Sequence, residues 1–296
     1  MAVIKPFSAY RPAPGKESEI AALPYDVYNR EEACEVVKKN PGSFLAIDRA
    51  ETAFSSDVDT YAPEVYAKAH ELLWGWIQEG RFVQEEKPCY YLYEQVMDGR
   101  SQKGIVACAS IDDYQNNVIK KHENTRADKE QDRINHVDIC SAQTGPIFLA
   151  YRACEPIRDL IRQVKKEAPL YDFVSPDGIG HRVWRIAEED RLAALEAGFT
   201  SLPAMYIADG HHRAASAVRV AVARREANPG YTGEEDFNYF LSVMFCEEEL
   251  KILDYNRVIK DLNGLTPGEF LTALEEKFQI TGCGQTQVHP QNKGEM

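Results

Sequence analysis

The chain has 296 residues, of which 44% are hydrophobic and 27% are charged, a composition typical of a folded globular protein. Its formal net charge of −13 excludes broad binding to nucleic acid, which needs a basic face, and no window reaches the roughly 18 apolar residues of a membrane span. Neither a nucleic acid nor a membrane is therefore an expected partner. Seven cysteines, an odd number without a C-x-x-C pair, favour a reducing cytoplasm over a disulfide framework.

The first hundred residues predict short strands and helices. Asn29 and Glu32 have the spacing of a capping box, in which two side chains satisfy free N–H groups at a helix start. Periodicity and the positions of proline and glycine give these elements in chain order: an edge strand at 3–10, a turn at 24–28, a helix at 29–40, a strand at 43–49, a helix at 63–80 and a strand at 88–97.

The rest of the chain mixes strands and helices without a regular βαβ period, which favours an α+β fold. The helix at 126–142 is polar, and Ile134, Val137 and Ile139 are its expected apolar contacts. The other predicted elements, in chain order, are strand 104–111, which closes a hairpin with 88–97, strand 145–151, helix 155–168, the hairpin of 171–174 and 182–186, helix 188–197 ending at Gly198, strand 205–209, a helix to 227, strand 237–245 with 250–255 as its candidate partner, and helix 267–278.

The stretch Met205–Val218 carries the strongest functional signal. An apolar run turns at Asp209-Gly210 into a small-residue helical pattern that begins with His211, His212 and Arg213. A helix N-terminus has free backbone N–H groups and a partial positive charge, and an arginine adds a planar donor fork for phosphate. Glycine permits close backbone approach or a positive φ. The pattern indicates an anion-binding helix start; the alternative is an Asp209 N-cap beside solvated side chains.

A second polar block, His122-Glu123-Asn124-Thr125-Arg126, precedes the helix at 126–142. Its carboxylate can complement the helix dipole, or it can act as a general base toward a substrate hydroxyl. The threonine can cap the helix or contact phosphate. Two helix starts with cationic side chains and an acid suggest phosphoryl transfer, which depends on positioning and charge neutralisation.

Metal binding is a minor part of this interpretation. Asp209 or Asp48 could help hold Mg²⁺, which takes one or two carboxylates together with phosphate oxygens. His211 and His212 are adjacent and not at i, i+4, so one helix face does not present two zinc ligands. P-loop, G-x-G-x-x-G and G-x-S-x-G motifs are all missing from the sequence.

At these residues the chain resembles the ParB/sulfiredoxin-fold superfamily, and within it the free serine kinases (SerK-like proteins). Those kinases have a Pro-His-Glu turn after the first core strand, then a helix, a strand and Asp-Gly-His-His-Arg. This chain follows that order with Lys121-His122-Glu123 and Asp209–Arg213, although Lys121 replaces the proline and 152–202 is an insertion. The whole chain looks like a long, largely uncharacterised branch of the group, whose members run past 296 residues, so a truncated C-terminus is expected.

The resemblance implies transfer of phosphate from ADP or ATP to free L-serine, giving O-phosphoserine, with Mg²⁺ as cofactor. Glu123 would take the hydroxyl proton, and Asp209 would be the other catalytic residue, placed in the nucleotide-phosphate site. The nucleotide-phosphate site would comprise Gly210, His211, His212, Arg213, His122 and Thr125. A nucleotide-gated regulatory protein of the same fold, without kinase activity, is the alternative. A homodimer is compatible with both the kinase and the regulatory protein.

The expected organisation has three parts: an N-terminal α/β extension, 1–103, packed on the core; a ParB/sulfiredoxin-like mixed-sheet core, 104–250, interrupted by the helical and hairpin insertion 152–202; and a C-terminal segment, 251–296. Some side chains outside the two motifs are candidates for substrate contact or for support of the site. These are Tyr25, Asp26, Asp48, Arg49 and Arg126.

Overall fold

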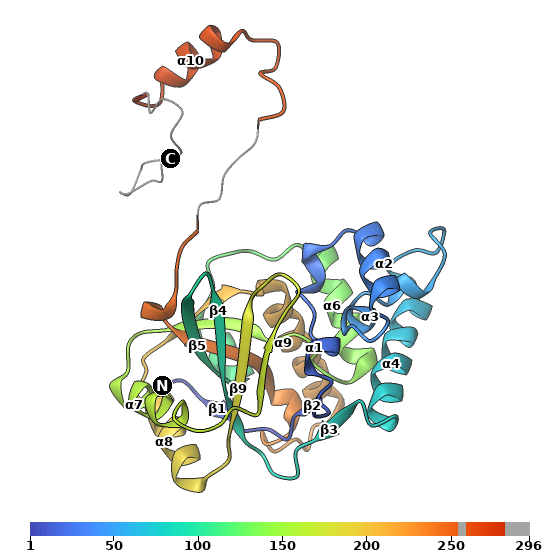
Figure 1. Ribbon diagram of the computed structural model, residues 1–296, viewed down its shortest axis with the longest axis vertical. Helices are drawn as coiled ribbons and strands as arrows, with labels where there is room; N and C mark the ends of the chain where they lie inside the picture. The colour runs from blue at the N-terminus through green and yellow to red at the C-terminus, as the bar shows by residue number, and fades with distance from the viewer. Residues whose placement is uncertain (254–258, 282–296) are drawn as a thin grey trace. The chain divides into compact units, whose positions relative to one another are not determined.

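The computed structural model describes residues 1–253 and 259–281 (Figure 1). The chain divides into two units, Met1–Leu250 and Lys251–Met296. Among the described residues, no helix combines the length and the apolar character needed to cross a bilayer.

The first unit contains a nine-stranded mixed sheet in the order β6-β10-β7-β11-β5-β4-β9-β8, with β1 paired to β5. The β6/β10 and β7/β11 pairs are parallel, whereas the other pairs are antiparallel. The strands are β1 (Ile4–Lys5), β4 (Tyr90–Met97), β5 (Arg100–Ser110), β6 (Ile119–Lys120), β7 (Ile147–Tyr151), β8 (Tyr171–Val174), β9 (Gly180–Ile186), β10 (Met205–Asp209) and β11 (Tyr239–Cys246). A mixed sheet with irregularly placed helices confirms the α+β class.

The sheet contains strands from the predicted N-terminal extension, the predicted core and the predicted insertion. Strand β4, from residues 1–103, pairs with β5 of the predicted core and with β9 of the segment 152–202. The predicted edge strand at 3–10 is divided: β1 joins the large sheet, while β2 (Tyr10–Pro12) pairs with β3 (Phe82–Gln84) in a separate ribbon. The first hundred residues therefore contribute directly to the sheet.

The helices pack on the sheet and on one another (Figure 1). Helix α9 contacts β7 and β11, α6 packs on α9, and α4 packs on α6, while α7 and α8 pack on each other. The helices of the first unit are α1 (Glu17–Ile20), α2 (Arg30–Lys39), α3 (Leu45–Asp48), α4 (Pro63–Gln78), α5 (Ile111–Gln115), α6 (Ala127–Cys140), α7 (Glu155–Val164), α8 (Glu189–Thr200) and α9 (His211–Ala227). Small alanines on α9 let it approach the sheet core closely.

The predicted strand at 43–49 is wrong, because this segment forms helix α3. Leu45, Ala46 and Ile47 are all buried in succession, which an alternating strand with one exposed face would not allow. The hydroxyl of Ser43 accepts a hydrogen bond from the Leu45 N–H and favours the helical turn. Short apolar runs do not distinguish a strand from a buried helix.

Two further predictions, the end of a helix and a candidate strand, differ from the structure. Helix α8 does not end at Gly198 but continues to Thr200. Gly198 serves packing: a Cβ there would lie 2.7 Å from the Ile157 side chain, so its absence lets α7 and α8 approach. The candidate strand at 250–255 is not seen over 250–253, and its last two residues lie outside the described residues. The capping box of Asn29 and Glu32 at the start of α2 is confirmed.

Helix α6 buries a polar face in place of the expected apolar one. Ile139 is exposed, and the buried residues are Glu130, Arg133, His136 and Cys140, which recur at helical spacing. Helix α6 packs on α4 and α9, and the buried polar side chains find partners on α9 and α3: Glu130 pairs with Arg219, and His136 bonds to the Ile47 carbonyl. The prediction from Ile134, Val137 and Ile139 failed because it assumed that apolar side chains define the buried face.

His136 on this face gives a prediction for the pH dependence of stability. Burial lowers the pKa of His136 below its ordinary value of 6.5, and Arg133 adds to this effect, so the ring is neutral in the folded protein. The unfolded chain takes up the proton first, so stability is expected to fall as the pH drops below about 6.5, by about 1 kcal/mol between about pH 7.5 and 5.5.

Urea unfolding at several pH values measures this dependence. A His136→Gln variant can still donate to the Ile47 carbonyl, which lies 3.2 Å from His136 Nε2, but it does not titrate. The variant is expected to show a flatter pH profile than the wild type. An unchanged profile would assign the acid sensitivity to other groups.

The second unit contains one helix among its described residues, α10 (Pro267–Glu275). Thr266 and Glu269 form a capping box at its start. The predicted helix at 267–278 is thereby confirmed, with an earlier end.

Candidate functional site

The turn between β10 and α9 has a positive-φ glycine, as its sequence predicts. Gly210 is the N-cap of α9 with φ +89, a conformation that favours glycine. Asp209 does not cap the helix; its Oδ2 accepts a hydrogen bond from Arg213 Nη2 at 2.7 Å. Arg213 Nη1 also donates to the Pro146 carbonyl at 2.5 Å. The guanidinium is thus fixed beside the turn, and the alternative of an Asp209 N-cap is excluded by this geometry.

Helix α9 begins without any side-chain cap. The first N–H groups of such a helix have no intrahelical acceptor and carry a partial positive charge. They adjoin a pocket of about 60 Å³ lined by Tyr25, Asp26, Glu123, Asp209, Gly210, His211, His212 and Arg213. Since one water needs roughly 10–15 Å³ of such space, the pocket holds a few waters or one phosphate-sized group. All eight residues are among the predicted site residues.

Parallel strand pairing explains how distant residues meet in this pocket. Strands β6 and β10 lie side by side in parallel, with Met205 opposite Ile119 and Tyr206 opposite Lys120. The segments that follow the two strands therefore leave the sheet at the same edge. This places the loop 121–126 next to the start of α9.

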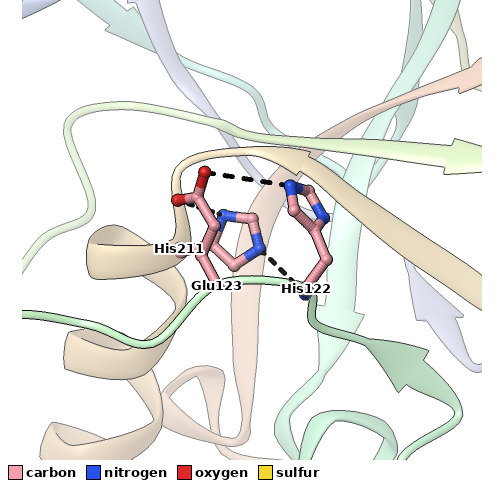
Figure 2. A group of neighbouring side chains, drawn as sticks. All are labelled: His122, Glu123 and His211. Atoms are coloured by element: carbon pink, nitrogen blue, oxygen red, sulfur yellow. Dashed lines mark hydrogen bonds and ion pairs between the residues drawn. The ribbon is translucent and has the colours of Figure 1, made fainter. Parts of the chain in front are cut away.

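The carboxylate of Glu123 faces two imidazoles, those of His122 and His211 (Figure 2). Its Oε2 is 3.5 Å from His211 Nδ1 and its Oε1 is 3.9 Å from His122 Nε2. The rings of His122 and His211 meet edge to face, with centroids 4.5 Å apart. The Glu123 side chain is 61% exposed, so its carboxylate is accessible to a ligand.

The protonation of His211 follows from its contacts. Its Nε2 accepts a hydrogen bond from the His122 backbone N–H at 3.4 Å, so the proton of the neutral ring is on Nδ1 and faces Glu123. Burial lowers the pKa of His211, and the nearby His122 adds to this effect, although Glu123 and Asp209 oppose it. A neutral His211 that donates toward the carboxylate orients Glu123.

These three residues could also form a metal site. The possible ligand atoms of His122, Glu123 and His211 all lie within 4.8 Å of one another. A metal-bound His211 Nδ1 would leave a proton on Nε2, which would then face the His122 N–H. Two donors facing each other are unfavourable, so the geometry favours a histidine–carboxylate pair over a metal centre.

The N-terminal part of the chain forms one wall of the pocket. Arg49 donates to the carbonyls of Tyr25 and Tyr28, at 2.9 and 2.5 Å, and so holds the turn that carries Asp26. The Arg133 guanidinium lies 4.1 Å from the centre of the Tyr25 ring. Burial raises the pKa of the Tyr25 phenol, which keeps it neutral.

Other predicted site residues lie outside the pocket lining. Asp48 accepts a hydrogen bond from Thr144, at 2.6 Å, and supports the segment before β7. Thr125 donates to Glu130 at 2.5 Å, and the Arg126 side chain pairs with Asp128 at 2.8 Å. In the structure these side chains, like Arg49, support the loops of the site.

Three contributors to the site were not predicted from the sequence: Arg133, Glu130 and the Pro146 carbonyl. A carbonyl has no sequence signature. The two charged residues have one, because Glu130 and Arg133 recur at helical spacing with His136 in a helix of few apolar residues. That spacing is the signal that could have revealed a buried polar face.

The fold and the pocket together define an α+β protein with a charged pocket beyond the ends of two parallel strands. The family model described as "Protein of unknown function (DUF1015)" matches residues 4–296, and the chain belongs to this family. The comparison with curated proteins finds no match. The comparison with solved structures finds none either.

A Gly210→Ala variant tests the turn. Alanine at this position would have to adopt the positive φ of Gly210, and its Cβ would lie 3.2 Å from Arg213 Nε and Nη2. We expect a loss of about 1–2 kcal/mol in the free energy of unfolding, because an L-residue with a side chain disfavours this conformation. Urea unfolding measures it. Gly230→Ala is the matched control, since Gly230 has nothing within 4 Å of its Cβ position; equal effects in both variants would contradict the argument.

Proposed function

We propose that the protein is a small-molecule kinase that transfers phosphate from ADP or ATP to the hydroxyl of free L-serine, giving O-phosphoserine. One observation carries the proposal: an accessible carboxylate, Glu123, and an uncapped helix start with Arg213 line the same small pocket. A proton acceptor and an anion site are the two parts that phosphoryl transfer to an alcohol needs.

In this proposal Glu123 takes the proton of the serine hydroxyl. The hydroxyl oxygen then forms a bond to the terminal phosphorus of the nucleotide, and the bond from that phosphorus to the bridging oxygen breaks. The leaving group is AMP from ADP, or ADP from ATP. The pocket, at about 60 Å³, accommodates the transferred phosphoryl group, and the rest of the nucleotide lies outside it.

The charges of the pocket favour a nucleotide that carries Mg²⁺. Its lining contains three carboxylates, Asp26, Glu123 and Asp209, against one guanidinium, that of Arg213. Bare phosphate would be repelled by this excess of negative charge. Asp209 Oδ1 has no hydrogen-bond partner among the described residues and fits one carboxylate ligand of Mg²⁺ beside phosphate oxygens, where the ion would neutralise charge.

The other parts of the proposal follow from the same chemistry. ADP, ATP and free serine meet in the cytoplasm, which we take as the location. The partners are a nucleotide and a small hydroxylated amino acid. A homodimer is compatible with this function, and the oligomeric state of the purified chain would test it.

The direct test mixes the purified chain with L-serine, Mg²⁺ and either ADP or ATP. Mass spectrometry should detect phosphoserine together with AMP or ADP in equal amounts. The alternative function is a nucleotide-binding switch of the same fold. Binding of both nucleotides without phosphoserine, with a nucleotide-dependent change in oligomeric state, would reject the kinase and favour the switch.

A further inference from the structure

The two adjacent histidines at the start of α9 contact the loop 121–126 from opposite ends. His211 Nε2 accepts the His122 N–H at 3.4 Å, and His212 Nε2 accepts the Arg126 N–H at 3.1 Å. Adjacent helical side chains point about 100° apart, so one helix turn can reach both ends of the loop. Glu123 lies between the two anchored N–H groups.

His212 belongs to a continuous face of α9. His212, Ser216 and Arg219 lie at i, i+4 and i+7, on one side of the helix. The hydroxyl of Ser216, fully buried, lies 2.7 Å from the His212 carbonyl and 3.0 Å from the Glu130 carbonyl, and either can accept its hydrogen. Arg219 Nε lies 2.7 Å from Glu130 Oε1. This face contacts the end of the loop and the first turn of α6.

Glu130 connects that face to the loop. Its side chain is 10% exposed, and its Oε2 accepts the hydroxyl hydrogen of Thr125 at 2.5 Å. Arg126 is the N-cap of α6 and makes no side-chain cap. The imidazole of His212 therefore occupies the acceptor position for the Arg126 N–H, at the point where the loop becomes helix.

We infer that His212 is a positioning residue, which fixes the loop 121–126 and through it the carboxylate of Glu123. Its Nε2 accepts the Arg126 N–H, so this nitrogen acts on the loop and cannot also donate to a phosphate. His211 differs because its Nδ1 also faces Glu123. Both histidines accept a backbone N–H of the loop, but only His211 also faces Glu123. A substitution of His212 therefore tests the loop contact without removing a neighbour of the carboxylate.

Two variants separate acceptor chemistry from side-chain bulk. In His212→Gln, the amide oxygen can occupy the position of Nε2 and accept the N–H, whereas His212→Leu has similar size and no acceptor. Amide hydrogen exchange, resolved by NMR, should show a roughly tenfold loss of protection at Arg126 in the leucine variant, the scale of one hydrogen bond. The glutamine variant should retain protection near that of the wild type, and amides of β7 and β11 should be unchanged in both.

A kinetic test rests on the proposed kinase activity. Displacement of a catalytic group by about 1 Å can cost about a hundredfold in rate, so the leucine variant should lose about ten- to a hundredfold in kcat. The KM for ADP or ATP should change less than twofold, and glutamine should restore most of the rate.

The two measurements distinguish the possible failures. Equal protection of Arg126 in wild type and leucine variant, or equal loss in both variants, would overturn the positioning role. Loss of MgADP affinity in both variants with Arg126 protection intact would assign His212 to phosphate binding instead. If the wild type makes no phosphoserine, the proposed function fails, while the exchange experiment still decides the role of His212.

Discussion

A Glu123→Gln variant is expected to lose phosphoserine formation by about 10²–10⁴-fold, the contribution of a positioned general base. Glutamine matches the size of glutamate and can keep an oxygen facing His211 Nδ1, which lies 3.5 Å from Glu123 Oε2, so the loop should keep its conformation. It cannot take the hydroxyl proton. Phosphoserine formation under saturating nucleotide measures the rate, and calorimetric titration with MgADP should give a Kd within about threefold of the wild type.

The control for this variant is Glu86→Gln, which removes an exposed carboxylate that does not line the pocket. It should leave both rate and affinity unchanged. Full activity in Glu123→Gln would remove Glu123 from the proposed mechanism. A strong loss of MgADP binding would show that the carboxylate acts on the nucleotide and not on the acceptor.

The same variant separates a base from a metal ligand. If His122, Glu123 and His211 held a transition metal, the wild type would bind Zn²⁺ tightly and the glutamine variant would bind it at least tenfold more weakly. The histidine–carboxylate pair inferred from the His211 contacts predicts no such difference. Titration with Zn²⁺ in the absence of nucleotide makes the comparison.

The start of α9 could be predicted because its signal is local. Asp209 and Gly210 interrupt an apolar run, and only a few residues are needed to recognise a strand, a turn and a helix start. Glu123 could be selected for the same reason, since it precedes a polar helix. The parallel pairing of β6 and β10 brings these two signals together, and no local pattern encodes it.

The predictions that were wrong concern features that depend on long-range contacts. The segment at 43–49 has apolar residues consistent with either a strand or a helix, and packing decides between them. The buried face of α6 was missed because Glu130, Arg133 and His136 are polar residues that stay inside only through partners from other elements. Arg133 is the case in which this matters most for both the fold and the site.

An Arg133→Met variant is expected to lower the free energy of unfolding by about 3–5 kcal/mol. The guanidinium is buried, and its Nε donates to Asp132 Oδ2 at 2.9 Å. Burial lowers the pKa of Arg133, but Asp132, Tyr25 and Asp48 outweigh it and raise the pKa, so the group stays charged. Methionine fills much of the volume but leaves the Asp132 carboxylate, whose side chain is 10% exposed, without its cation. Urea unfolding followed by circular dichroism measures the loss.

Two comparisons decide whether this loss comes from the buried charge. Arg162→Met removes an arginine that pairs with Glu155 on the surface of α7, where both side chains are 55% exposed, and should cost less than about 1 kcal/mol. The double variant Arg133→Met/Asp132→Asn should recover part of the stability, because asparagine is neutral and can still accept from Tyr66, 3.0 Å away. Additive losses in the double variant would contradict a buried ion pair.

Arg133→Met should also change ligand binding in the pocket, because Arg133 lies against the ring of Tyr25, which lines the pocket wall. Below the unfolding transition, MgADP affinity should fall in Arg133→Met and remain unchanged in Arg162→Met. A destabilised chain with unaltered affinity would restrict Arg133 to the fold. A parallel fall in stability and affinity would instead show that the buried polar face of α6 holds the N-terminal wall at the pocket.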